Sequence, residues 1–461
     1  MSARTHRTMG AEEIRKATKR AKRSKSANGS KTGANGRGPS WANQCTRTRA
    51  GAIDGANVHN VLIALRHAPE WCDVLAFDAF ARHVVIRREI PAGGKAATRN
   101  LPRMLEDSDV LAALEWFHAQ GMVALRKGML HDAMLLHARD HGRFHPVLDY
   151  FHELLTAEEP REVPSIINGH RIDPDQPGNA LSLLLTLGFG AADTPLNRAI
   201  SRAFMISMVR RVRQPGCQHD HLLVLIGDQG IGKSGGLATL VGAEWFTDHL
   251  PELHSKDALI QLHGKVLIEW AEMGALRRSQ VERSKMFITS RIDTFRPPYE
   301  RAAVNVPRAC SFAGTSNIGD FLDDATGGRR FWPVECERTD LTWIEANRSL
   351  LWRLAAEAES AGEDGWITAT DLQDELIKHQ ADAQRPDVWE DCVRDYASKR
   401  AVDGVHINAD FLLGALSIPI KDQHNGHMQR VAAILKRAGW ERARRSRADG
   451  QARRWLPKTS R

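Results

Sequence analysis

The segment Gly227–Ser234, which reads GDQGIGKS, constrains the fold more than any other feature of this chain. It fits the pattern G-x-x-x-x-G-K-[ST] and follows an apolar run, His221 to Ile226, that is typical of a strand. A strand that ends in this pattern predicts a phosphate-binding loop. Its glycines let backbone amides surround phosphate, its lysine neutralises phosphate charge, and its serine ligates magnesium. We therefore expect ATP and Mg²⁺ as cofactors, held by Gly227, Asp228, Gln229, Gly230, Ile231, Gly232, Lys233 and Ser234.

Two further glycines follow this loop where a helix is expected to begin. Gly235 and Gly236 come directly after Ser234. Each glycine inside a helix costs about 1 kcal/mol relative to alanine. The pair is therefore expected to soften the start of the helix and to affect turnover more than nucleotide binding.

Two more apolar runs predict strands of the same sheet, Lys265–Ile268 and Ala309–Gly314. Strand-like runs alternate with helical segments from about residue 200 to residue 360, which predicts an α/β domain with a largely parallel sheet. Each run ends in polar residues. Because ligands bind beyond the carboxyl ends of such strands, these residues are the candidates for an active site.

The candidate catalytic residues follow those two strands. Glu269 can hold magnesium or polarise water, and Glu272 can share that work only if the chain turns helical after Glu269. Otherwise the two carboxylates point apart, and both could simply be solvated. Asn317 can hold the attacking water and sense the γ-phosphate, or it can be only a turn residue.

The segment Thr326–Pro333, TGGRRFWP, holds two adjacent arginines after a pair of glycines. Arg329 or Arg330 suits an arginine finger that reaches the γ-phosphate of a neighbouring subunit. A structural ion pair is the alternative. If the finger interpretation holds, the active site is completed in trans and the chain must form an oligomer.

Arginines alternate with aromatic residues between the second and third strands, in the segment Arg291–Arg301. On this proline-stiffened loop, Arg296, Tyr299 and Arg301 could contact phosphates and stack on bases. A rigid protein interface is an equal alternative.

Charge is distributed unevenly along the chain. Residues 1–50 carry 13 Lys or Arg against 2 Glu, and residues 441–461 carry 8 against 2 acids, whereas the whole chain has a net charge of +8. The body between these ends is therefore acidic. Basic ends favour attachment to nucleic acid, although a solvated basic arm has the same composition.

These patterns predict four regions. Residues 1–50 are expected to be a basic disordered arm, residues 51–200 a mainly helical N-terminal region, and residues 201–360 a P-loop ATPase domain. Residues 361–461 are expected to form a helical, winged-helix-like basic domain with a ribbon turning at Asp449-Gly450. Its arginines Arg444 and Arg445 are candidate DNA contacts, and a basic solvated terminus is the alternative.

Other classes of protein are disfavoured. The six cysteines form no Cys-x-x-Cys pair, so neither a disulfide framework nor a zinc ribbon is indicated. No run of about 18 apolar residues and no secretory signal is present, so no membrane partner and a cytoplasmic location are expected.

The order of these motifs resembles the virulence-associated protein E family, phage- and island-borne ATPases related to superfamily 3 helicases and phage primase-helicases. The resemblance covers most of residues 55–340. It implies an AAA+/superfamily 3-like core that assembles as a homo-oligomeric ring, with Lys233 and Ser234 at the nucleotide, Glu269 in the acidic motif, Asn317 as sensor and Arg329 or Arg330 as finger. It also implies a role in replicating phage or mobile-element DNA. No zinc knuckle is indicated in the N-terminal region, and a separate primase is an expected partner.

Two functions remain open from the sequence. The first is an ATP-driven DNA helicase or translocase that acts on single-stranded or forked DNA. The second is an ATP-gated DNA-binding or regulatory factor that does not separate strands. A metabolic kinase with the same loop is disfavoured by the basic ends and the candidate finger.

Overall fold

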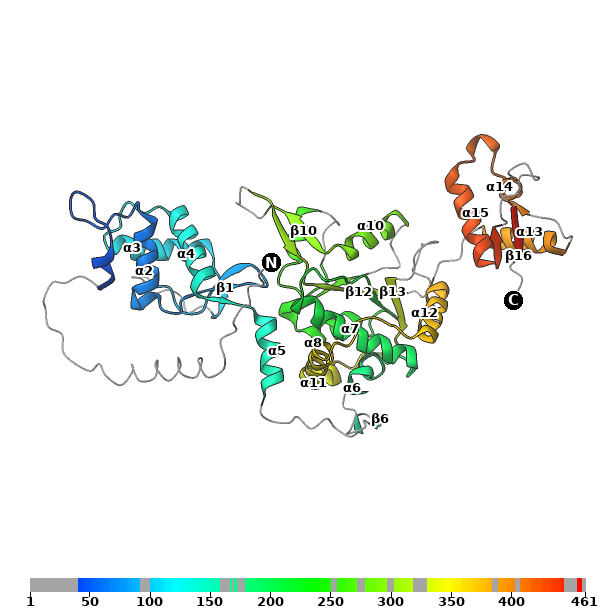
Figure 1. Cartoon of the computed structure of the whole chain (residues 1–461), viewed down its shortest axis with the longest axis horizontal. Coiled ribbons are helices and arrows are strands. Elements are labelled where there is room, and N and C mark those ends of the chain that lie inside the picture. Colours follow the sequence, from blue (N-terminus) through cyan, green and yellow to red (C-terminus); the bar gives the residue numbers. More distant parts are fainter. Residues whose placement is uncertain are drawn as a thin grey trace, which may run out of the picture. The chain divides into compact units, whose positions relative to one another are not determined.

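The computed structural model describes residues 40–91, 100–157, 166–167, 170–171, 179–249, 255–271, 278–296, 302–317, 330–383, 389–402, 407–442 and 454–457. The chain divides into two units, one of residues 1–75 and 86–142 and a larger one of residues 76–85 and 143–461. Figure 1 shows the elements along the chain. Among the described residues, no helix combines the length and the apolar character that a membrane span requires.

The smaller unit is helical. Its elements are the 3-10 helices η1 (Ser40–Gln44) and η2 (Pro69–Trp71), the helices α2 (Val58–His67), α3 (Asp107–Ala119) and α4 (Lys127–His141), and the short strand β3 (Arg103–Met104). Large aromatic side chains fill its interior. The Trp41 ring stacks on Trp116, with ring centroids 6.0 Å apart, and Trp71 meets the edge of the same ring.

Residues 40–50 are ordered, although the sequence places them in a disordered arm. Trp41 is 1% exposed and supplies the apolar area that the rest of the predicted arm lacks. Asn60 holds the segment beyond it, since its Oδ1 accepts from the Thr46 backbone N–H at 2.9 Å and its Nδ2 donates to Asp54 O. The remainder of the predicted arm, residues 1–39, lies outside the described residues.

A five-stranded parallel sheet forms the centre of the larger unit, in the order β13-β7-β12-β9-β8. Its strands are β7 (Leu222–Ile226), β8 (Phe246–Thr247), β9 (Leu267–Trp270), β12 (Ser311–Ser316) and β13 (Phe331–Glu335). All four pairings are parallel. The predicted mixed α/β fold with a parallel sheet is therefore confirmed, with each of the three predicted strands within two residues of its expected ends.

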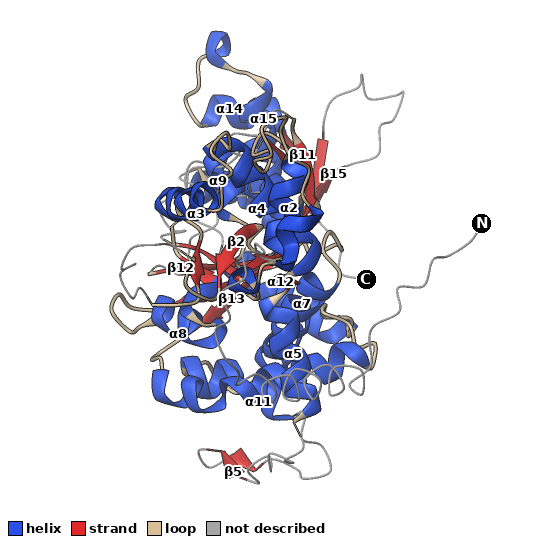
Figure 2. Cartoon of the chain, turned by 90° about the vertical axis from the view of Figure 1, so that its left-hand side faces the viewer, coloured by secondary structure: helices blue, strands red, loops and turns tan. Residues whose placement is uncertain are grey.

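Helices cover both faces of this sheet (Figure 2). They are α5 (Pro146–Thr156), α6 (Asn179–Ser182), α7 (Pro195–Arg213), α8 (Lys233–Val241), α9 (Lys256–Gln261), α10 (Arg278–Thr289), α11 (Leu341–Ser360) and α12 (Thr370–Asp382), with the π-helix η3 (Leu184–Gly188) and the 3-10 helix η4 (Ala243–Trp245). The boundary expected at residue 200 falls inside α7. That helix begins at Pro195 after an N-cap, Thr194, whose hydroxyl accepts from the Asn197 N–H.

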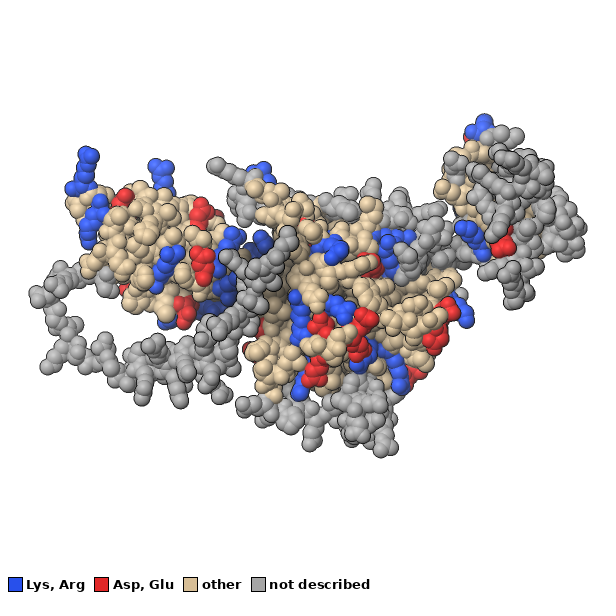
Figure 3. Space-filling view, viewed as in Figure 1, with Lys and Arg blue, Asp and Glu red and all other residues tan. Residues whose placement is uncertain are grey.

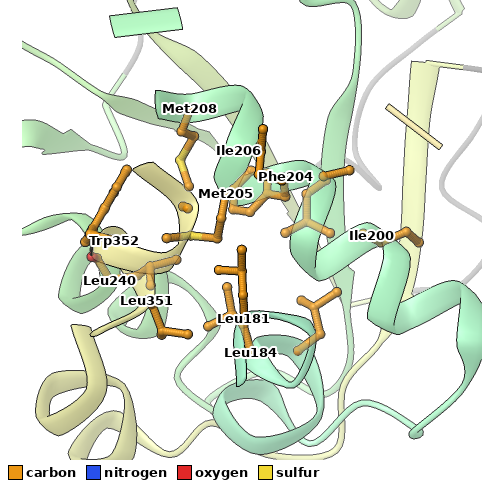
Figure 4. Packing of buried hydrophobic residues seen from close by; sticks show 14 of the residues in the cluster. Leu181, Leu184, Ile200, Phe204, Met205, Ile206, Met208, Leu240, Leu351 and Trp352 are labelled. Atoms are coloured by element: carbon orange, nitrogen blue, oxygen red, sulfur yellow. Dashed lines mark hydrogen bonds between the residues drawn. The ribbon is translucent and has the colours of Figure 1, made fainter. Parts of the chain in front are cut away.

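The largest apolar core lies between α7, α11 and one face of the sheet (Figure 4). Phe204, Met205 and Met208 of α7 face Leu351 and Trp352 of α11, and all five are buried. The indole N–H of Trp352 donates to the Leu240 carbonyl of α8 at 2.8 Å. This core fixes α8, and with it the loop that precedes α8.

Short strands complete the larger unit. β1 (Leu75–Asp78) pairs in parallel with β4 (Arg143–Phe144), and β2 (His83–Ile86) follows β1 along the chain. The ribbons β5 (Ile166–Ile167) with β6 (His170–Arg171) and β10 (Ile292–Phe295) with β11 (Val304–Pro307) are antiparallel.

The C-terminal part has its own apolar core. It consists of α13 (Glu390–Val402), α14 (Ala409–Ala415), the 3-10 helix η7 (Ile420–Asp422), α15 (Asn425–Arg437) and the strands β14 (Ile407–Asn408), β15 (Trp440–Arg442) and β16 (Arg454–Pro457). β16 pairs antiparallel with both β14 and β15. The predicted turn at Asp449-Gly450 lies outside the described residues.

His219, buried just before β7, makes stability depend on pH. Burial, with the nearby Arg211 charge acting in the same direction, lowers the pKa of His219 from 6.5 to about 3. The unfolded chain therefore binds a proton below pH 6.5 that the folded chain does not accept until about pH 3. The folded state therefore keeps its full stability above pH 6.5, and the free energy of unfolding falls as the pH decreases from 6.5 to about 3.

We expect His219→Gln to flatten this pH dependence. Between pH 7 and pH 5 the free energy of unfolding should fall by about 2 kcal/mol more in the unmodified chain than in the variant. Urea unfolding at both pH values measures the difference. His152→Gln, an exposed position on α5, is the control and should keep the original slope; an equal slope in His219→Gln would contradict the prediction.

Candidate phosphate-binding site

The predicted phosphate loop joins β7 to α8. β7 is fully buried, so its end at Ile226 is fixed in the sheet. Gly230 and Gly232 then adopt φ values of +89° and +88°, in the left-handed region that favours glycine. Gly232 is the N-cap of α8, which begins at Lys233. The glycine pattern therefore allows the chain to turn from a buried strand directly into a helix N-terminus.

Gly227 is required for a different reason, the close approach of the neighbouring strand. A Cβ on Gly227 would overlap the carbonyl oxygen of Cys336, which follows β13. The Cys336 N–H donates to the Ile226 carbonyl at 2.7 Å and holds the two segments together. Burial raises the pKa of the Cys336 thiol to about 12, so this sulfur packs as an uncharged group.

The glycine pair after Ser234 lies within a helix that runs unbroken from Lys233 to Val241. The two positions differ in what surrounds them. A Cβ on Gly236 would lie 2.6 Å from Phe189 Cε1 and 2.7 Å from Thr339 Cγ2, so this glycine allows the helix to pack closely. A Cβ on Gly235 would lie 3.6 Å from Leu341 Cδ2, which is an ordinary contact.

Alanine at these two positions should therefore have opposite effects. We expect Gly235→Ala to stabilise the larger unit by up to about 1 kcal/mol through helix propensity. We expect Gly236→Ala to destabilise it by about 1–3 kcal/mol through overpacking against Phe189. Urea unfolding of the two variants measures this. If both variants changed the free energy of unfolding by the same amount and in the same direction, the different packing around Gly235 and Gly236 would have no effect on stability.

Lys233 is held inside the loop. Its Nζ donates to the carbonyl oxygens of Gly227 at 2.7 Å and Asp228 at 2.8 Å, and to Asn317 Oδ1 at 3.2 Å. The side chain is 6% exposed, and burial lowers the pKa of Lys233 from 10.5. Among the described residues, the hydrogen-bond partners of this buried ammonium are neutral oxygens, so it is well placed to exchange them for anionic phosphate oxygens.

Glu269 lies opposite the loop, in β9. Its Oε1 accepts from the Ser234 hydroxyl at 2.7 Å and from the Thr315 hydroxyl at 2.6 Å. The residue is 1% exposed, and its Oε2 has no hydrogen-bond partner among the described residues. A buried carboxylate with one unsatisfied oxygen beside a serine hydroxyl fits a magnesium site, because Mg²⁺ prefers oxygen ligands from one or two carboxylates and substrate phosphates.

The structure brings together four of the residues that the sequence selects for phosphate binding, magnesium and catalysis. Lys233, Ser234, Glu269 and Asn317 meet at the carboxyl edge of the sheet, where parallel neighbours end together. β9 continues to Trp270, so Glu269 itself has extended backbone. Glu272 lies outside the described residues.

Thr315 is a site residue that the sequence did not single out. It is the fifth residue of β12, and its hydroxyl fixes Glu269 from the neighbouring strand. Its position before Ser316 and Asn317 indicates only that it lies near the end of a strand. The register of β12 on β9, which the sequence does not give, brings the hydroxyl to the carboxylate.

Arg330 lies at the amino ends of the parallel strands, opposite the carboxyl ends where the phosphate loop lies. It comes just before β13, and the register pairs Phe331 with Leu222 at the start of β7. The loop after Ile226 is therefore about 16 Å away, given five residues at about 3.3 Å each. Arg330 cannot reach the loop of its own chain. Arg329 lies outside the described residues.

The candidate DNA-contacting residues lie on a β-ribbon. In the pairing of β10 with β11, Ile292 lies opposite Pro307 and Phe295 lies opposite Val304. Arg296, which is exposed, follows β10 directly. At the base of the ribbon, the buried Arg308 forms an ion pair with Asp293, in which Arg308 Nε donates to Asp293 Oδ2 at 3.0 Å. Tyr299, Arg301, Arg444 and Arg445 lie outside the described residues. On the face shown in Figure 3, the described acidic and basic side chains are interspersed.

A match to a family model spans the position of this site. The family model described as "Virulence-associated protein E-like domain" matches residues 176–386. Two solved structures of the apo NrS-1 C-terminal region (305-718) are each 14% identical; one match covers 83% of this chain and 95% of that chain with a TM-score of 0.41, the other 88% and 99% with 0.40. No curated protein matches the chain significantly. Residues 176–386, which include the phosphate loop, Glu269 and Asn317, therefore match a virulence-associated protein E-like domain.

Proposed function

We propose that this chain is a Mg-ATP-dependent P-loop ATPase, with an AAA+/superfamily 3-like core, that works as a helicase or translocase on phage or mobile-element DNA. One observation carries the proposal. The lysine of the phosphate loop contacts Asn317, and the serine of the loop contacts a buried carboxylate, Glu269, on a second strand. These are the groups that positioning and charge stabilisation of a transferred phosphoryl group require.

Each side chain has a distinct part in this proposal. Mg²⁺, when bound, supplies positive charge to the phosphates, and the Ser234 hydroxyl and Glu269 would hold it. Lys233 leaves the loop carbonyls to bind phosphate. Asn317, which is exposed and accepts from Lys233, is then released to orient a water molecule. Glu269 is also the candidate for polarising that water.

DNA contact is assigned to the β10–β11 ribbon and to the C-terminal part. The ribbon places Arg296 next to a segment that also contains Tyr299 and Arg301. The Arg308–Asp293 ion pair anchors the base of the ribbon. Arg308 lies three residues before β12, the strand that is followed by Asn317. Such a ribbon can bind phosphates and stack on bases while it remains attached to the strand that ends at Asn317.

Strand separation on a forked duplex tests this function. The purified chain should separate a fork with single-stranded arms when Mg-ATP is present, and Lys233→Ala should not. Separation by Lys233→Ala at the unmodified rate would overturn the proposal.

A second function is favoured by the C-terminal architecture. The described C-terminal part has three α-helices and a three-stranded antiparallel sheet, and residues 441–461 of the sequence are basic. This combination is compatible with a winged-helix-like DNA-binding domain. In this case ATP would gate DNA binding without unwinding. ATP-dependent retention of duplex DNA, together with no strand separation on the fork, would identify this second function.

A further inference from the structure

The start of β13 is held by packing on both faces of the sheet. Phe331 belongs to the apolar core on one face and Trp332 to the core on the other, and both side chains are fully buried. The register places Phe331 opposite Leu222 of β7. The backbone of the residue directly before Phe331, which is Arg330, therefore begins from a fixed point.

Helix α12 adds a polar contact at the same point. Gln380 is 5% exposed, and its Nε2 donates to the Phe331 carbonyl at 2.8 Å. Buried polar side chains are normally paired, and this bond pairs Gln380 with a residue 49 positions away. Apolar packing has no preferred direction, whereas a hydrogen bond does. Gln380 therefore sets the orientation of the peptide group at the start of β13.

The Arg330 side chain leaves the chain from this peptide group. The residue is half-buried, and its Nε is shielded from solvent and has no hydrogen-bond partner among the described residues. The phosphate loop of the same chain lies at the other ends of the strands, out of its reach. The direction in which Arg330 extends is therefore set chiefly by the backbone from which it starts.

We propose that Gln380 is a positioning residue for Arg330, which through the Gln380–Phe331 bond is directed toward the γ-phosphate held by a second copy of the chain. The inference rests on the proposed ATPase function, with Arg330 as the finger. Gln380 contacts no phosphate in this arrangement and acts through the backbone. A displacement of about 1 Å in a group that stabilises the transition state can cost about 10²-fold in rate, so one bond at this place has a measurable effect.

Gln380→Leu removes the donor and keeps an apolar side chain in its place. We expect kcat for ATP hydrolysis to fall about 10- to 100-fold, whereas KM for ATP changes by less than about twofold, because the loop is distant from Gln380. Gln373→Leu is the matched control. Gln373 of α12 also donates from Nε2 to a carbonyl at 2.8 Å, but that carbonyl is Ile367, outside β13. Gln373→Leu should hydrolyse ATP at the unmodified rate.

Mixed oligomers separate a positioning role from a structural one. When Gln380→Leu is mixed with Lys233→Ala, the intact loop of the first chain can meet a correctly placed Arg330 of the second. Hydrolysis should therefore exceed that of the two components. When Gln380→Leu is mixed with Arg330→Ala, no chain supplies a correctly placed arginine, and hydrolysis should stay low.

Three results would overturn the proposal. The first is an unmodified kcat in Gln380→Leu, and the second is recovery with Arg330→Ala in place of Lys233→Ala, which would show damage to the loop of the same chain. The third is recovery in neither mixture, which would assign Gln380 to folding alone. Failure of the ATPase proposal looks different, because the unmodified chain would then not hydrolyse ATP.

Discussion

Glu269→Gln is expected to lower the rate of ATP hydrolysis about 10²- to 10⁴-fold while ATP still binds. The substitution keeps the shape of the side chain, so the hydroxyls of Ser234 and Thr315 keep an acceptor. It replaces one carboxylate oxygen with an N–H donor and removes the negative charge. The residue is 1% exposed, so solvent cannot supply that charge instead.

Steady-state hydrolysis and equilibrium ATP binding, measured on the same preparation, check this expectation. Glu337→Gln is the control, because Glu337 is exposed in the segment just after β13. It should hydrolyse ATP at the unmodified rate. If Glu269→Gln hydrolyses ATP within about twofold of the unmodified chain, a role for this carboxylate in the chemical step is ruled out.

Arg330→Ala is expected to lower hydrolysis by about 10³-fold or more, the effect of losing an arginine finger. The reason is geometric. Arg330 precedes β13 at the amino edge of the sheet, while the loop follows β7 at the carboxyl edge. Since the arginine cannot reach its own loop, it can act as a finger only on a neighbouring subunit.

Mixing two inactive variants tests this directly. In an oligomer of Lys233→Ala and Arg330→Ala chains, some sites combine an intact loop from one chain with an intact Arg330 from the other. Activity should therefore reappear in the mixture. Arg330→Ala mixed with the double variant Lys233→Ala/Arg330→Ala is the control and should stay inactive. A mixture of the two single variants that is no more active than its components would contradict a finger in trans.

The centre of the sheet could be predicted from the sequence because its strands are continuous apolar runs. β7, β9 and β12 are buried on both faces, and buried parallel strands leave such runs in the sequence. β13 was not predicted, since Pro333 lies within it and proline normally argues against a strand. The proline is tolerated because β13 is the outermost strand of the sheet and pairs only with β7 in the strand order.

The site could be predicted only as far as local sequence reaches. The loop residues, Glu269 and Asn317 each follow from a strand end. The contact of Thr315 with Glu269 depends on register between strands 46 residues apart, and the position of Arg330 depends on the direction of β13.

The most direct test of the central claim is ATP hydrolysis by the purified chain with and without single-stranded DNA, at low and moderate salt, beside Lys233→Ala. We expect that single-stranded DNA stimulates hydrolysis, that moderate salt weakens this stimulation through loss of phosphate contacts, and that Lys233→Ala abolishes hydrolysis. Full hydrolysis by Lys233→Ala would contradict the proposed ATPase function, because Lys233 is the cation that the loop holds for phosphate.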